Sequence, residues 1–137
     1  MTRTLQSGLP LAVPVTVFSA WVLVGAAIFV SPEQFHELTP GVSQFGPFNA
    51  HFIRDVGLVY VASGLVGLYG LRTASASLCI AAALWSCLHG VFHLHLWIHR
   101  GFPFDAIFLF DLGFVIVPPF VVLAQAALGW TRPAFRL

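Results

Sequence analysis

The stretch ASLCIAAALWSCLHGVFHLHLWIH, residues 76–99, decides the fold of this chain. It is long enough to cross a bilayer as one α-helix, since a transmembrane helix needs about 20 predominantly apolar residues. It also carries histidines at positions 89, 93, 95 and 99. Two questions follow: what solvent surrounds this segment, and why does it hold so many titratable side chains?

Composition answers the first question. Hydrophobic residues make up 58% of the 137 residues and charged residues only 8%. A soluble domain averages roughly 25% charged residues, so this chain is too poor in polar side chains to cover a water-facing surface. We therefore predict an all-α integral membrane protein surrounded by the lipid bilayer. Its length fits a single domain, residues 1–137.

Three further apolar stretches complete the predicted architecture. A connection at 72–75 is short, and Gly101 and Pro103 mark another at 100–103 as a turn. The apolar run at residues 11–30 is longer than the core of a secretory signal peptide, so we expect it to be a membrane span. The sequence thus predicts a four-transmembrane-helix bundle. Its spans lie at about residues 11–30, 51–71, 76–99 and 104–128.

The connection between spans one and two, residues 31–50, is longer and contains a helix signal. In the segment SPEQFHEL, Ser31 is placed to cap a helix, Pro32 suits its first position, and Gln34 would complete a capping box. We expect a short helix at the membrane interface, ending near Thr39. Asn49 is the predicted cap of the second span.

The arginines predict the orientation in the membrane, because cytoplasmic loops carry an excess of basic residues. Both termini are therefore expected in the cytoplasm, and the loop 31–50 outside it, in a bacterial inner membrane. Four spans place Arg3, Arg72, Arg132 and Arg136 on one side and Arg54 and Arg100 on the other.

Charge and cysteine content exclude other classes. The chain has no lysine and a net charge of +1, so no basic surface is available for nucleic acid. Cys79 and Cys87 form neither a C-x-x-C motif nor a zinc-like set. We expect both to be small core residues, since a disulfide along one helix is geometrically implausible.

Ionisable residues on three spans fall at nearly the same depth, counting about 1.5 Å of rise per residue. A charged group in hydrocarbon costs at least about 2.5–3.5 kcal/mol, so we expect these groups to face one another in an outward-facing polar cluster. Arg54 is expected to lie within ion-pair reach of Asp111 or Asp55. The predicted cluster comprises His51, Arg54, Asp55, His89, His93 and Asp111.

Helical periodicity sorts the four histidines of residues 76–99. His89 and His93 are four residues apart and stack on one face, whereas His95 and His99 form a second pair turned about 120° away. We expect this second pair at the interface or against another subunit. Small residues are expected to allow close helix approach in span two, and two prolines to kink span four. These residues are Gly57, Ser63, Gly64, Gly67, Gly70, Pro118 and Pro119.

The cluster admits several functions. His89 and His93, completed by Asp111, Asp55 or His51, suggest a transition-metal site, although the H-E-x-x-H motif is absent. A b-type haem would need a histidine on another helix facing this pair. The cluster could equally be a structural network in an accessory subunit, or a site for a small apolar ligand, quinone or proton. Expected partners are the lipid bilayer and a homo-oligomer or larger membrane complex.

One stretch has a family resemblance. NAHFIRDVGLVY at 49–60 resembles the N-x-H-F-x-R-D-x-G pattern of small bacterial four-helix membrane proteins, loosely like the DoxX group, and HGVFH at 89–93 fits the same pattern. The resemblance implies the four-helix architecture and this choice of polar residues, but no reaction. The matching positions are Asn49, His51, Phe52, Arg54, Asp55, Gly57, His89 and His93.

Overall fold

A computed structural model describes residues 11–128, which fold into helices and contain no β-strand. Arg3, Arg132 and Arg136, on which the predicted orientation depends, lie outside the described residues. The helices are α1 (Ala12–Val30), α2 (Pro32–Leu38), α3 (Val42–Phe45), α4 (Ala50–Arg72), α5 (Ala76–His99), α6 (Ala106–Phe110), the π-helix η1 (Asp111–Ile116) and α7 (Val117–Ala127).

Four helices are long and apolar enough to cross a membrane, as the sequence predicts. They are α1, α4, α5 and the continuous helix Ala106–Ala127, which α6, η1 and α7 make together. Each end lies within two residues of its predicted position. Hydropathy therefore located the long helices closely, because each is predominantly apolar over its length.

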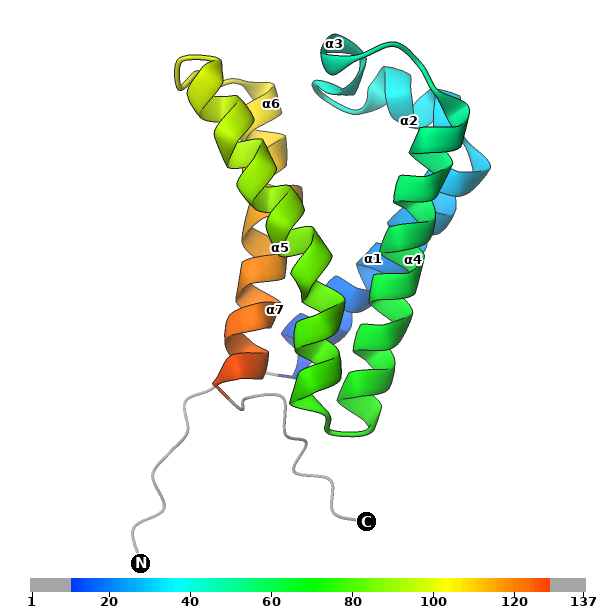
Figure 1. The fold of residues 1–137 in the computed structure, drawn as a ribbon, viewed down its shortest axis with the longest axis vertical. Helices are drawn as coiled ribbons and strands as arrows, with labels where there is room; N and C mark the ends of the chain where they lie inside the picture. The colour runs from blue at the N-terminus through cyan, green and yellow to red at the C-terminus, as the bar shows by residue number, and fades with distance from the viewer. Residues whose placement is uncertain (1–10, 129–137) are drawn as a thin grey trace, which may run out of the picture.

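The helices pack as two groups that diverge. α1 packs along α4, and α5 packs against η1 and α7; α4 and α5 join the two groups. Figure 1 shows that they meet near the turn between α4 and α5 and separate toward the end that carries α2 and α3. Residues at equal height on α4 and α5 are thus close at one end of the molecule and far apart at the other.

Glycines allow the close crossing of α1 and α4. A Cβ atom on Gly57 would lie 2.8 Å from the backbone oxygen of Gly25, and one on Gly64 would lie 2.6 Å from the backbone oxygen of Phe18. A side chain larger than hydrogen at either position would therefore overlap the α1 backbone. The predicted packing role of these glycines is confirmed.

The core lies where the two groups meet. Phe18 and Trp21 of α1 pack there with Cys79 of α5 and Val122 of α7, all of them buried. Cys87 is also buried, and both cysteines are free thiols. Their predicted role as small core residues is confirmed.

The predicted helix between spans one and two is present as α2, but its predicted cap is wrong. Pro32 is the first residue and Thr39 follows the last, yet the Ser31 side chain caps no backbone N–H, so no capping box with Gln34 forms. Ser31 directly follows α1, and its N–H still bonds to the carbonyl of Ala27 at 2.9 Å. Its backbone (ψ 63°) therefore departs from the extended conformation typical of an N-cap residue.

The start of α4 agrees with the prediction. Asn49 Oδ1 accepts a hydrogen bond from the backbone N–H of Phe52 at 3.1 Å, which satisfies one of the free donors of the first turn. The single turn α3 was not predicted. It begins after Gly41, whose φ of 88° favours glycine.

The fourth span departs from regular α-helix before its two prolines. Pro118 and Pro119 have no N–H to donate to the preceding turn, and the six residues of η1 stand immediately upstream in π-helical geometry. The sequence predicted a kink at the prolines and did not predict this π-helix. Such segments are frequent at functional sites, and η1 begins with Asp111.

Candidate functional site

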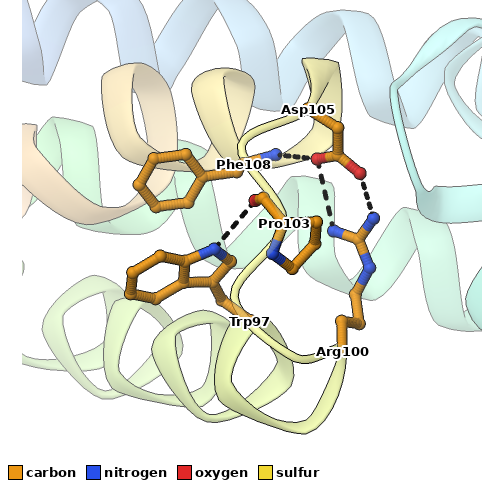
Figure 2. A network of polar contacts seen from close by, with 5 residues as sticks. All are labelled: Trp97, Arg100, Pro103, Asp105 and Phe108. Atoms are coloured by element: carbon orange, nitrogen blue, oxygen red, sulfur yellow. Dashed lines mark hydrogen bonds and ion pairs between the residues drawn. The ribbon is translucent and has the colours of Figure 1, made fainter.

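The turn between α5 and α6 is held by a polar network, shown in Figure 2. Asp105 accepts a hydrogen bond from the backbone N–H of Phe108 at 2.9 Å and forms an ion pair with Arg100. Trp97 Nε1 donates to the carbonyl of Pro103 at 2.9 Å. The Trp97 ring also stacks on Phe108, with 4.5 Å between ring centroids. The two helices of this hairpin, α5 and α6, are therefore fixed in register.

This register positions two side chains of the predicted cluster. His93 lies four residues before Trp97, and Asp111 lies three residues after Phe108. Side chains three or four apart on a helix lie one turn from each other. The Trp97–Phe108 contact thus places His93 and Asp111 at one level, a turn further into the molecule.

We expect Asp105→Asn to lower the thermal unfolding temperature at neutral pH, because asparagine can still cap α6 but cannot pair with Arg100. The hydrogen bond from Arg100 and that from Phe108 hold the pKa of Asp105 below its ordinary 3.8. The ion pair therefore contributes stability above that value and loses it as pH falls through the lower, folded-state pKa.

The measurement is the unfolding temperature of both proteins in detergent across the acidic range. The difference between wild type and Asp105→Asn should disappear at the acid end, and Arg100→Gln should remove the same increment. A difference that persists unchanged at all pH values would contradict this account.

His93 and Asp111 form the central contact of the site. His93 Nδ1 lies 2.9 Å from Asp111 Oδ2, and the two side chains are only 20% and 11% exposed. The contact is electrostatic, since the described residues offer His93 Nδ1 no aligned hydrogen bond. Gly90 lets η1 approach α5, because a Cβ there would lie 3.2 Å from the Val115 carbonyl oxygen.

Aromatic rings extend the site from this pair toward the core. His89 packs edge-on against His93, with 4.6 Å between centroids, and lies flat on Trp85 at 5.0 Å and 10°. Trp85 in turn meets Tyr60 of α4 edge-on at 5.2 Å. We call Tyr60, Trp85, His89, His93 and Asp111 the His–Asp site.

Sequence reasoning identified three members of this site and missed two. Tyr60 and Trp85 lie in apolar spans of a chain with 15% aromatic residues, so their residue types alone did not distinguish them from lipid-facing or core aromatics. One usable signal was spacing. Trp85, His89 and His93 repeat every four residues and so share one face of α5.

The other predicted cluster members lie elsewhere. His51 Nδ1 pairs with Asp55 Oδ2 at 3.0 Å on α4, and the side chains are 89% and 58% exposed. Arg54 Nε donates to the carbonyl of Phe29 at 3.2 Å. The expected ion pair of Arg54 with Asp111 or Asp55 is wrong for the described residues. The first turns of α4 have diverged from α5 and α6 at this height (Figure 1).

The predicted metal ligands do not come together as a complete set in the described residues. Within residues 11–128, no group of three or more His, Cys, Asp or Glu side chains is arranged to hold a metal ion. Of the predicted set His89, His93, Asp111 and Asp55, the last belongs to the exposed pair on α4. His51, the haem candidate on α4, pairs there with Asp55.

His95 and His99 form the separate pair that helical periodicity predicts. Their ring centroids are 4.0 Å apart, both side chains are exposed, and His99 Nδ1 contacts the carbonyl oxygen of His95 at 3.1 Å. The contacts of His95 and His99 therefore leave them outside the His–Asp site.

Comparisons with known proteins add no relative. No protein family, curated protein or solved structure matches this chain. The resemblance of residues 49–60 to the DoxX group stays a prediction.

Proposed function

We propose that this chain is a four-span integral membrane protein that binds a small apolar ligand with hydrogen-bonding oxygen atoms, of the quinone class, at the His–Asp site. The observation that carries the proposal is the contact of 2.9 Å between His93 and Asp111, placed among aromatic rings in two of the four apolar helices. In this proposal His93 donates a hydrogen bond to the ligand oxygen, and Asp111 holds the His93 ring in place.

The chemistry of the side chains supports this function. Histidine can donate and accept hydrogen bonds and titrates near neutral pH, whereas a carboxylate only accepts. Tyr60 and His89 add hydroxyl and imidazole groups, and Trp85 supplies a flat apolar surface. Ionisable residues inside a membrane are costly and mark functional sites by default. His93 and His89 also retain partial exposure, so a ligand within the bilayer can reach them.

We further propose the cellular location that the sequence predicts. Four apolar helices support a multi-pass protein, and the arginine distribution favours an inner membrane with both termini in the cytoplasm. The α2–α3 segment and the turn between α5 and α6 then face outward. The homo-oligomer or larger complex stays a prediction.

The proposal is tested by titrating detergent-purified protein with a short-tailed alkyl benzoquinone and following tryptophan fluorescence, since Trp85 lies on His89. Asp111→Asn should weaken binding about tenfold, because Asp111 holds the His93 ring that donates to the ligand oxygen, and leaving such a donor unsatisfied costs about 1–3 kcal/mol. Asp55→Asn is the matched control, since it alters the exposed pair on α4, and it should leave the affinity unchanged.

A purely structural role is the second candidate, favoured by the fact that the His93–Asp111 contact joins α5 to η1. It predicts that the quinone causes no saturable quenching and that Asp111→Asn changes only the unfolding temperature. That pair of results, or equal weakening by Asp55→Asn, would overturn the ligand-binding proposal.

A further inference from the structure

A second site lies on the other group of diverging helices, where α1 ends and α4 begins. An open pocket of about 440 Å³ is formed there by the start of α2 and the first turns of α4. None of its lining residues belongs to the His–Asp site. The lining residues that matter here are Val30, Glu33, Gln34, Phe48 and Arg54.

The pocket carries one cation and one anion that do not neutralise each other. The hydrogen bond from Arg54 Nε to the Phe29 carbonyl anchors the guanidinium at the end of α1. Within residues 11–128 the ion pairs are His51–Asp55, His93–Asp111 and Arg100–Asp105. Arg54 and Glu33 therefore line the same space without pairing. A ligand with both an anionic and a cationic group would satisfy them together.

The position of the pocket indicates where such a ligand comes from. Val30 is the last residue of one apolar span, and Ala50, the first residue of another, also lines the pocket. In the proposed membrane location, the ends of the spans lie at the level of the polar lipid headgroups. Val30 and Phe48 add apolar surface beside the charges, as expected where a headgroup joins its acyl chains.

We propose that this pocket binds the headgroup of a zwitterionic phospholipid with a primary ammonium, a phosphoethanolamine lipid. Arg54 takes the phosphate, because its guanidinium presents several N–H donors in a plane that matches phosphate oxygens. Glu33 accepts hydrogen bonds from the ammonium. A phosphocholine headgroup has no N–H to donate, and a phosphoglycerol headgroup has no cation, so both bind less well.

The proposal rests on the membrane location under the proposed function, but not on the His–Asp site. The test is native mass spectrometry of the full-length protein in detergent with an equimolar mixture of phosphoethanolamine, phosphocholine and phosphoglycerol lipids. We expect at least tenfold preference for the phosphoethanolamine lipid, the effect of about one charge-assisted hydrogen bond. Asp111→Asn should keep this preference, so that failure of one site is distinguishable from failure of the other.

Matched variants assign the preference to the two charges. Glu33→Gln should abolish the preference over phosphocholine and phosphoglycerol, whereas Glu37→Gln on the same short helix should retain it. Arg54→Gln should lose all three lipids, and Arg54→Lys, which keeps the charge, should retain part of the binding if the helix ends stay folded. Equal retention of the three lipids by the wild type, or loss of preference in Glu37→Gln, would overturn the proposal.

A final arm separates a lipid from a soluble ligand. Glycerophosphoethanolamine carries the same headgroup without acyl chains. It should displace the lipid at least tenfold more weakly than a short-chain phosphoethanolamine lipid does. Equal displacement would show that the pocket recognises a soluble zwitterion and would overturn the assignment to a membrane lipid.

Discussion

Gly25→Ala is expected to lower the free energy of unfolding by about 3 kcal/mol, at the upper end of the usual effect of overpacking. A Cβ at this position would lie 2.5 Å from the carbonyl oxygen of Gly57 and 2.8 Å from the backbone nitrogen of Val61. Both atoms belong to the α4 backbone and cannot rotate aside. α1 would have to move away from α4 along much of their shared interface.

Gly113→Ala is the matched control, because it adds the same methyl group to another apolar helix. A Cβ on Gly113 would have no atom within 4 Å besides those of its own neighbouring helical backbone. Removing a glycine from a helix interior should stabilise it by about 0.5–1 kcal/mol. Both variants are measured by titration with a denaturing detergent. Equal effects of the two substitutions would show that the crossing of α1 and α4 does not depend on close backbone approach.

The sequence predicted the long helices well because their signal is local. Each span is a continuous apolar run, and hydropathy locates its ends without any knowledge of neighbouring helices. The cap at Asn49 is local in the same way. Ser31 shows the limit of such reasoning, because the same residue also ends α1, and that second role prevents it from acting as a side-chain cap.

The structure brings His93 and Asp111 of the predicted polar cluster together but leaves Arg54 and Asp55 outside it, and the reason is geometric. Depth along each helix follows from residue number, and it correctly placed His93 level with Asp111. Lateral separation does not follow from residue number. The first turns of α4 diverge from α5, so Arg54 and Asp55 bond to local partners instead. Proximity requires equal depth and a helix crossing, and the sequence supplied only the first.

Two further features could not be predicted from local patterns. The Arg100–Asp105 pair depends on the backbone path of the turn, where Phe102 takes a φ of 61° and Gly101 one of 79°. The π-helix η1 precedes two prolines and packs against Gly90, a contact between helices that no local pattern reveals. Both features affect the His–Asp site, since they determine where Asp111 lies.

His93→Leu is expected to lower the free energy of unfolding by about 3 kcal/mol, the lower end of the range for breaking a buried ion pair. The lower end applies because the two side chains keep 20% and 11% exposure. The cost arises from Asp111, whose carboxylate would be left in apolar surroundings without its partner. Asp111→Val should cost less, because the remaining imidazole of His93 can stay neutral.

The double variant His93→Leu with Asp111→Val decides whether the pair itself stabilises the fold. With both polar groups gone, no charge is left unpaired, and the double variant should recover to within about 1 kcal/mol of wild type, as buried pairs replaced by apolar residues often do. The same cycle at His51 and Asp55, whose side chains are largely exposed, should show a coupling of at most about 1 kcal/mol. If the double variant is instead as unstable as the sum of its single variants, His93 and Asp111 are not coupled. The contact between them could then neither hold α5 against η1 nor position His93 to hydrogen-bond a ligand.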